Sequence, residues 1–284
     1  MGVPRNRKPA LENKSGHVSY KDFRKERWNS LARKFGDTEP LRAVISSDSD
    51  QVNYYFDKTT KRMLDRSLQL KHRRVLDLGC GIGRLSVWMA RKAEHVIGVD
   101  ISEEMTRVAR NIAASEGLCN VTFEVYDGTT LLYGDTSFDV VVCTGVLKYI
   151  LDEEDLSRVI KETCRTVVCG GQIAVIDQFD YDGPVKLSGE EDLGGLSVLR
   201  HPSVYISLFQ KHGVELVEQC SIYRRRFLNQ GETVLLKLPL GRVIAAQPLI
   251  ARAMATVDVW LDEILRHRVN SIRGFQFLSF VRRL

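Results

Sequence analysis

The sequence predicts an α/β fold in which a wound parallel sheet is covered by helices on both faces. From Arg74 to the end of the chain, short apolar runs alternate with helical patterns, which is typical of such a sheet. The middle runs, "FDVVVCTG" and "GQIAVIDQF", are nearly continuous in apolar residues and indicate strands buried on both faces. With 284 residues, 44% of them hydrophobic, the chain is long enough to bury a full core.

Seven apolar runs are expected to form strands: "RRVLDLG", "HVIGVDI", "VTFEVYD", "FDVVVCTG", "GQIAVIDQF", "VELVEQCSIY" and "FQFLSFVRR". Helices are expected between them at residues 84–92, 102–116, 152–168 and 203–212. The acids of "DEED" stand at the start of the third helix, where they complement its dipole, and Pro202 stands beside the start of the fourth.

Two regions depart from this alternation. Residues 1–34 are expected to form a basic arm, solvated or disordered, and residues 35–70 a helical cap that includes "YYFDKTTKRMLDRSLQL". Residues 228–273 form an insertion between the last two strands. One domain is therefore expected over residues 35–284, with its core at 74–227 and its last strand at 274–284.

Charge and composition narrow the function classes. Residues 1–34 hold ten Lys or Arg and three acids, a larger excess than the +5 of the whole chain, so this arm is able to attract nucleic acid or anionic lipid. The mean hydropathy is −0.17, and neither a membrane-spanning run nor a signal-peptide core is seen, which predicts a cytoplasmic protein. Six cysteines without a CxxC pair and six histidines without HExxH spacing predict buried thiols and no metal site.

The stretch "VLDLGCGIGRLSVWMA" marks the candidate binding site. Glycines at the end of a strand that turns into a helix expose backbone N–H groups and the positive helix end, a geometry used by adenine cofactors. Arg84 occupies the position of the third glycine in a dinucleotide-binding G-x-G-x-x-G motif, which argues against NAD or FAD. No Gly-Lys-Ser/Thr follows, so a phosphate-binding P-loop is excluded.

"DLGCGIG" resembles the glycine motif of class I S-adenosylmethionine-dependent methyltransferases, and later segments match that family in order. These are "HVIGVDIS", "VYDGTTL", "FDVVVCTGVLKYI" and "VCGGQIAVID". The resemblance implies a Rossmann-like seven-stranded mixed sheet whose last strand is antiparallel. It also implies S-adenosylmethionine as the cofactor and S-adenosylhomocysteine as its product.

The resemblance assigns roles to two aspartates. Asp100 is expected to hold the ribose hydroxyls, because a carboxylate can accept two hydroxyl hydrogen bonds. Capping of the next helix, the alternative for Asp100, is better assigned to Ser102. Asp127 and Gly128 are expected to read the adenine edge, with a plain turn as the alternative for Asp127.

Other residues are expected along the same cofactor. Asp77 either orients the glycine loop or reaches the amino group of the cofactor. Tyr54 or Tyr55 closes over the methionine end, unless "NYYF" belongs to the core. The remaining residues expected at the cofactor are Gly79, Cys80, Gly81, Gly83, Ile101, Met105, Thr129, Cys143 and Thr144.

Catalysis of methyl transfer depends mainly on positioning, because the sulfonium methyl group is already activated. A hydroxyl acceptor benefits from a general base. The family often reads Leu-Glu-His after the fourth strand, whereas this chain has Leu147, Lys148 and Tyr149. The candidate catalytic residues are His201, then Tyr149, then Asp177, with an ordinary surface histidine as the alternative for His201.

The insertion at residues 228–273 would emerge at the cofactor end of this fold, because it joins the sixth strand to an antiparallel seventh. Its apolar residues fit one or two amphipathic helices. These helices either pack as ordinary core or form an apolar lid over a medium-sized or hydrophobic acceptor. "RHR" at residues 266–268 would then be available to an anionic group.

The leading hypothesis is methylation of an O, N or C atom of a small metabolite, natural product, sugar or lipid-linked acceptor. The alternative is methylation of RNA or protein, with the basic arm as a docking element. No Asn-Pro-Pro-Tyr or Asp-Pro-Pro-Tyr motif supports that alternative. A nonenzymatic binding protein with the same fold is the third hypothesis, and the intact cofactor motifs argue against it.

Overall fold

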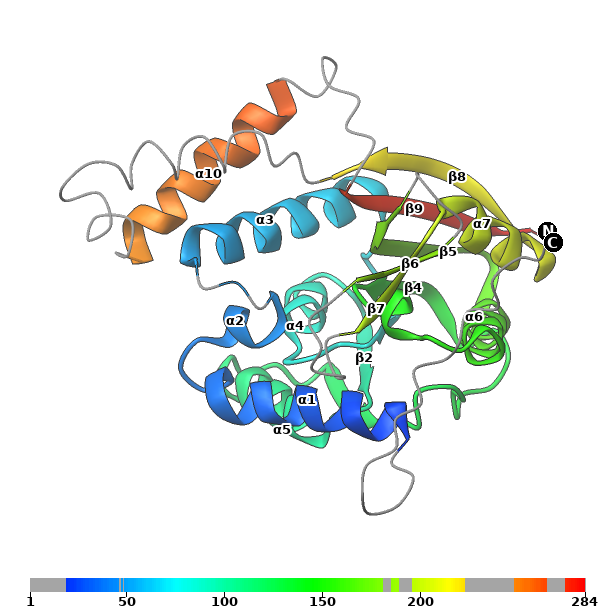
Figure 1. Ribbon diagram of the computed structural model, residues 1–284, viewed down its shortest axis with the longest axis horizontal. Coiled ribbons are helices and arrows are strands. Elements are labelled where there is room, and N and C mark those ends of the chain that lie inside the picture. Colours follow the sequence, from blue (N-terminus) through cyan, green and yellow to red (C-terminus); the bar gives the residue numbers. More distant parts are fainter. Residues whose placement is uncertain are drawn as a thin grey trace, which may run out of the picture.

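A seven-stranded sheet forms the centre of the computed structural model, which describes residues 19–45, 47, 49–180, 185–188, 196–222, 248–264 and 274–283 (Figure 1). The strand order is β3-β2-β1-β4-β5-β9-β8. β9 is antiparallel to both of its neighbours, and the other pairs are parallel. The strands are β1 (Arg74–Leu78), β2 (His95–Asp100), β3 (Val121–Val125), β4 (Phe138–Thr144), β5 (Val167–Phe179), β8 (Val214–Ser221) and β9 (Gly274–Arg282).

This arrangement confirms the predicted fold class, including the antiparallel last strand. The order of the strands reverses at β1, whose neighbours are β2 and β4. Leu78, the last residue of β1, pairs with Val99 on one side and with Cys143 on the other. The carboxyl ends of these three strands therefore meet at a topological switch point, where open parallel sheets bind ligands.

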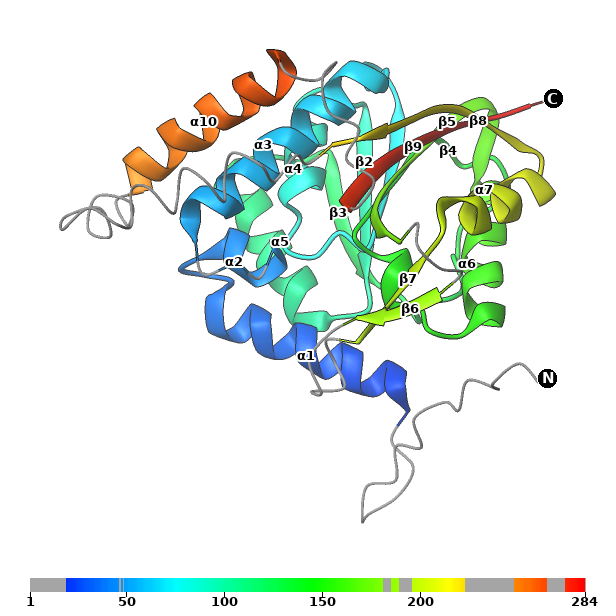
Figure 2. The ribbon, with the colours of Figure 1, turned by 45° about the horizontal axis from the view of Figure 1, so that its top comes forward.

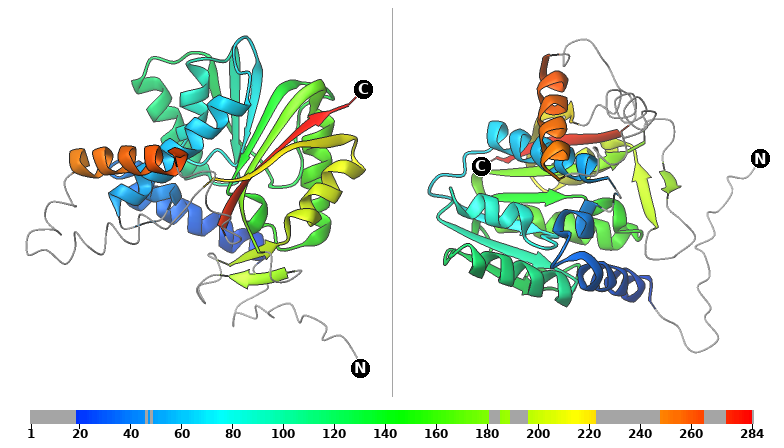
Figure 3. Two further views of the ribbon diagram at one scale, coloured as in Figure 1. Left: turned by 90° about the horizontal axis from the view of Figure 1, so that it is seen from above. Right: turned by 90° about the vertical axis from the view of Figure 1, so that its left-hand side faces the viewer.

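Helices cover both faces of the sheet, as Figure 3 shows. Neighbouring residues of a strand point to opposite faces, so Val75 and Leu76 belong to different core clusters. The helices on the Val75 face are α3 (Asp50–Ser67), α4 (Arg84–Ala90) and α5 (Glu103–Ser115). Those on the Leu76 face are α6 (Glu153–Thr166) and α7 (Pro202–Lys211).

The N-terminal region differs from the expected basic arm, because residues 20–34 belong to a packed helix, α1 (Tyr20–Phe35). α1 lies along α5, and the short α2 (Pro40–Ile45) follows it (Figures 1 and 2). Trp28, Ala32 and Phe35 of α1 pack in a cluster with Val108 of α5. Burial of this apolar face explains why a strongly basic segment is folded. Residues 1–18 lie outside the described part of the chain.

The described part of the insertion is α10 (Pro248–Ile264), which lies along α3 (Figures 1 and 3). Ala255 and Val259 of α10 join the core cluster of α3, and Arg252 stacks 4.8 Å from the centre of the Tyr54 ring. This contact agrees with the core-packing alternative for this helix. Residues 228–247 and 265–273, including "RHR", lie outside the described residues.

A second, smaller sheet follows β5 in the chain. β6 (Val185–Ser188) pairs antiparallel with β7 (Ser197–Arg200). Buried Arg200 anchors β7, donating hydrogen bonds to the Ile150 carbonyl and to Glu153 at 2.9 and 2.8 Å. Residues 181–184 and 189–195 are not described.

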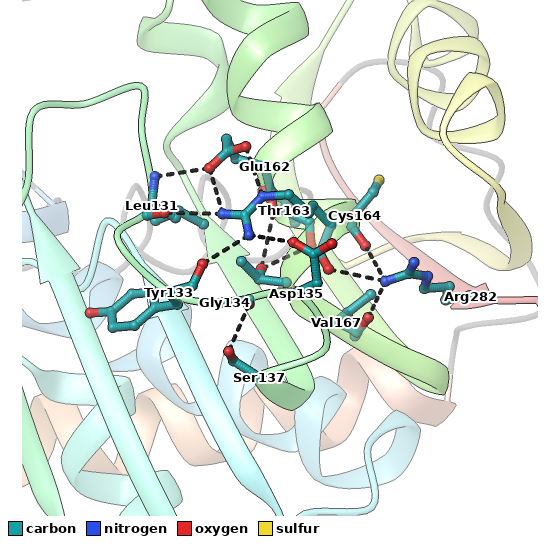
Figure 4. Close-up of polar contacts among 12 residues, drawn as sticks. Leu131, Tyr133, Gly134, Asp135, Ser137, Glu162, Thr163, Cys164, Val167 and Arg282 are labelled. Carbon is teal, nitrogen blue, oxygen red and sulfur yellow. Dashed lines mark hydrogen bonds and ion pairs between the residues drawn. The ribbon is translucent and has the colours of Figure 1, made fainter.

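At the strand ends opposite the switch point, two arginines make polar contacts around the end of α6 (Figure 4). Arg282 of β9 donates to the carbonyls of Cys164, Arg165 and Val167, which are left without helical donors there. Arg165 binds Glu162 and Asp135.

Among the described helices, none is both long and apolar enough to cross a bilayer.

Candidate functional site

The loop after β1 depends on its glycines in two ways. Gly79 and Gly81 have φ values of 72° and 53°, in the left-handed region that side chains disfavour. A Cβ at Gly79 would lie 2.2 Å from Cγ2 of Val146, and one at Gly81 would lie 2.8 Å from Cγ1 of Val44. Side chains are therefore excluded from the place where the backbone would approach a ligand.

Asp100 fixes this loop from the end of β2. Its Oδ2 accepts the Gly81 N–H at 2.9 Å, and its Oδ1 accepts the Ser102 N–H at 2.9 Å. Burial raises the pKa of Asp100, whereas these two N–H bonds and the charge of Arg24 oppose that rise. The carboxylate is thus held rigidly beside the loop, and each oxygen keeps acceptor capacity for a further hydrogen bond.

A cavity lies at these strand ends. The space within it, open solvent at its mouth included, is about 640 Å³. Eight of the residues proposed from the sequence line it: Gly79, Gly81, Asp100, Ile101, Met105, Gly128, Thr144 and Tyr149.

α1 covers this cavity and touches both of its sides. Arg24 donates from Nη1 to the carbonyl of Tyr149, and the Trp28 ring meets the Tyr149 ring edge-on at 5.5 Å. On the other side, Asn29 accepts the hydroxyl hydrogen of Ser102 at 2.7 Å. Arg24 is 8% exposed, and its Nε has no hydrogen-bond partner among the described residues. The covering helix therefore presents a buried cation to the cavity.

Several residues that the sequence predicts to bind the cofactor do not line the cavity. Asp77 is buried and accepts the Ser86 hydroxyl hydrogen at 2.6 Å, and burial raises its pKa to about 6. Asp127 accepts the N–H groups of Thr129 and Thr130, each at 2.7 Å, as the turn alternative predicts. The other predicted residues that do not line the cavity are Cys80, Gly83, Thr129 and Cys143.

Tyr54 and Tyr55 are not brought to the cavity either. Tyr55 is 1% exposed in the core and packs edge-on against Phe56. Tyr54 packs against the same cluster beneath Arg252 of α10. The core alternative for "NYYF" therefore describes both residues, because α3 turns this face toward α10 and the sheet.

The three candidate catalytic residues are separated by the structure. Tyr149 lines the cavity from the short helix η1 (Leu147–Tyr149). His201 caps α7, where its Nδ1 accepts the Ser203 N–H at 3.2 Å, and it does not line the cavity. Asp177 is fully buried and accepts the N–H groups of Lys148 and Gln178 at 3.0 and 2.9 Å, so it anchors the turn after β4. Tyr149 alone of these three faces the site.

Sequence reasoning missed the wall contributed by α1. Trp28, Leu31, Ala32 and Phe35 follow the i, i+3, i+4, i+7 spacing of an amphipathic helix, which was the available signal. The lining residues not predicted are Arg24, Trp28, Val44, Tyr126, Gly145, Val146 and Ile150.

These residues fit an adenosine cofactor. The glycines keep side chains away from the loop, Asp100 offers carboxylate oxygens for ribose hydroxyls, and Ile101 and Val146 supply apolar surface for a flat base. When bound, S-adenosylmethionine supplies a methyl group already activated on sulfur. The role of the protein is then to hold the acceptor in line and to exclude water.

Comparison with known proteins gives the same picture. Residues 75–171 match a methyltransferase domain family. Methyltransferase GfsG of Streptomyces halstedii is 28% identical over 217 residues, which cover 67% of this chain and 76% of that protein. The ubiquinone biosynthesis O-methyltransferase of Coxiella burnetii is 32% identical over 112 residues, and the match covers 39% of this chain and 46% of that enzyme.

The fold also matches solved structures. Magnesium protoporphyrin IX methyltransferase from Synechocystis, solved with its cofactor bound, superposes with a TM-score of 0.59 over 95% of this chain and 100% of that one. At 16% sequence identity this similarity concerns the fold alone. Together, the matched domain and the aligned relatives support a class I S-adenosylmethionine-dependent methyltransferase, whose cofactor is S-adenosylmethionine, and the glycine loop beside Asp100 agrees with this assignment.

Proposed function

We propose that this enzyme transfers a methyl group to an O, N or C atom of a small molecule: a metabolite, natural product, sugar or lipid-linked acceptor. The covered cavity carries this proposal. Arg24 and Trp28 lie over the strand ends and contact Tyr149 across the site. A space closed in this way favours a compact acceptor over a folded macromolecule.

The known activities named for similar proteins support a small acceptor. One is a ubiquinone biosynthesis O-methyltransferase, and another, from Rauvolfia serpentina, is an ajmaline N-methyltransferase. Their acceptors differ widely, as expected when a shared cofactor core is combined with different covering elements. In this chain the covering element with described side chains at the cavity is α1 together with Val44 of α2.

Gly79, Gly81, Asp100 and Gly128 are proposed to hold the cofactor. Tyr149 is the proposed catalytic residue, because it lines the cavity at the end of β4. A phenol at this position can accept a proton from a hydroxyl acceptor or orient it by hydrogen bonding. His201 and Asp177 are assigned structural roles, because neither lines the cavity and both accept backbone N–H groups.

The macromolecular alternative receives no support from α1. Arg24 is committed to the Tyr149 carbonyl, and Lys25 pairs with Glu103 of α5 at 2.6 Å. These cations of the predicted docking arm make contacts within the protein. Arg33 also pairs within α1, with Glu26.

The test is release of S-adenosylhomocysteine by the purified chain supplied with S-adenosylmethionine and a panel of small acceptors, bulk RNA and unrelated proteins. We expect turnover on at least one small acceptor and none on RNA or protein. Turnover only on the macromolecules would overturn the proposal. Saturable cofactor binding without any turnover would favour a binding protein that retains the fold.

A further inference from the structure

Lys148 is a buried cation that the proposed cofactor and catalytic residues leave unused. It lies in η1 after β4, and it is only 8% exposed. Its ammonium group lies 5.0 Å from the centre of the Tyr149 ring and 4.8 Å from that of the Phe275 ring. A lysine held by two ring faces keeps its charge in a largely apolar setting.

The nearby carboxylate of Asp177 interacts electrostatically with this cation but forms no ion pair with it. Burial raises the pKa of Asp177, and the charge of Lys148 opposes that rise. Its oxygens, however, accept the backbone N–H groups of Lys148 and Gln178. Among the described residues, no carboxylate forms an ion pair with the Lys148 ammonium group. Because ring faces satisfy N–H donors only weakly, the three donors of this lysine remain available to a stronger acceptor.

Lys148 does not itself line the cavity, but it contacts a residue that does. Tyr149, whose ring it contacts, lines the cavity and meets Trp28 of α1. Phe275 is the second residue of β9 and pairs in register with Gln178, one residue beyond Asp177 at the carboxyl end of β5. The ammonium group therefore lies at the carboxyl ends of β4 and β5, beside the proposed catalytic phenol and away from Asp100 on β2.

We infer that Lys148 binds a carboxylate on the acceptor, so that the substrates are small carboxylic acids whose methylated atom is brought to the Tyr149 side of the cavity. This inference rests on the proposed methyl transfer to a small molecule. A single buried ammonium matches a singly charged carboxylate, and a charge-assisted bond in a largely dry setting is strong and directional. Lys148 thus selects and positions the acceptor.

The test uses matched acids and amides with the enzyme saturated by S-adenosylhomocysteine for binding, or by S-adenosylmethionine for turnover. The pairs are 4-hydroxybenzoate with 4-hydroxybenzamide, 3,4-dihydroxybenzoate with its amide, and indole-3-acetate with its amide. We expect the acids to bind or turn over at least about tenfold better than their amides, as loss of a charged hydrogen bond predicts. Equal or inverse preference, or no uptake of any acid, would overturn the inference.

Two variants identify the residue responsible. Lys148→Met keeps an unbranched side chain that packs well between aromatic rings, and should abolish the preference for acids. Lys148→Arg keeps the charge and should retain part of it. A preference that survives in Lys148→Met would place acid recognition elsewhere and contradict the inference.

Cofactor affinity separates this inference from the proposed function. Calorimetric binding of S-adenosylhomocysteine should be equal in the wild type and in Lys148→Met, which also shows that the variant is folded. Cofactor binding together with turnover of neutral small acceptors would preserve the proposed function while refuting the role of Lys148. Failure of the wild type to bind the cofactor would refute both.

Discussion

The carboxylate of Asp100 accepts the backbone N–H of Gly81 at 2.9 Å, which joins the end of β2 to the glycine loop after β1. The same carboxylate accepts the N–H of Ser102 at the start of α5. A single buried side chain therefore fixes the glycine loop relative to the start of α5. The following predictions examine this site and the structure that supports it.

Substitution Asp100→Ala should weaken S-adenosylmethionine binding tenfold or more. It removes an acceptor for ribose hydroxyls, and hydrogen bonds to charged groups contribute about 1.5–3 kcal/mol each. Isothermal titration calorimetry measures the change. Glu116→Ala, which removes the partner of an exposed ion pair beyond the end of α5, is the matched control and should bind normally. Unchanged affinity in Asp100→Ala would remove the ribose role.

Substitution Arg24→Met should loosen the cover over the cavity and speed cofactor release. The side chain bonds to the Tyr149 carbonyl, and its loss leaves that carbonyl without this donor. We expect a dissociation rate for S-adenosylhomocysteine about tenfold higher or more, consistent with about 1.5–3 kcal/mol for one charge-assisted bond. Stopped-flow fluorescence follows the release. Arg33→Met changes an exposed residue of the same helix, and an equal effect there would show that Arg24 has no special role.

The pH dependence of stability should carry a contribution from Asp77, whose pKa burial raises to about 6. Between the ordinary aspartate pKa of 3.8 and about 6, the folded state binds more protons than the unfolded state. Stability therefore falls as the pH rises through this interval and is constant above it. Relative to Asp77→Asn, the wild type should lose about 1–3 kcal/mol from about pH 4 to pH 7. Urea unfolding of both proteins tests this, and a constant difference would contradict it.

Substitution Arg282→Ala should destabilise the fold without changing cofactor affinity. Arg282 donates to three carbonyls at the end of α6, on the edge of the sheet opposite the cavity (Figure 4). Their loss should cost about 1–3 kcal/mol of unfolding free energy. Thermal and denaturant unfolding measure this cost, with Arg283→Ala, an exposed ion-pair partner of Glu215, as the control. An equal loss in both variants would show that the carbonyl contacts are unimportant.

The sheet and the cofactor side of the site could be predicted because their signals are local. Gly79, Gly81 and Asp100 stand at strand ends that apolar runs mark in the sequence, and parallel strands bring those ends together. The starts of α5 and α6 could also be predicted from a local signal, because the side chains of Ser102 and Asp152 cap the first turns of these helices.

The remaining parts of the site depend on contacts distant in sequence. Arg24 reaches the cavity only because α1 packs on α5, and its basic composition suggested a solvated arm instead. His201 looked suited to catalysis by its chemistry, but its place before Pro202 makes it a helix cap. Tyr55 looked suited to the cofactor, but α3 presents it to the core.

The central claim is that the loop of Gly79 and Gly81, together with Asp100, binds S-adenosylmethionine. The most direct measurement is a crystal structure of the chain with S-adenosylhomocysteine. The ligand is predicted between this loop and α1, with its ribose hydroxyls on the Asp100 carboxylate. Density for the ligand at any other place, or none at a saturating concentration, would contradict the claim.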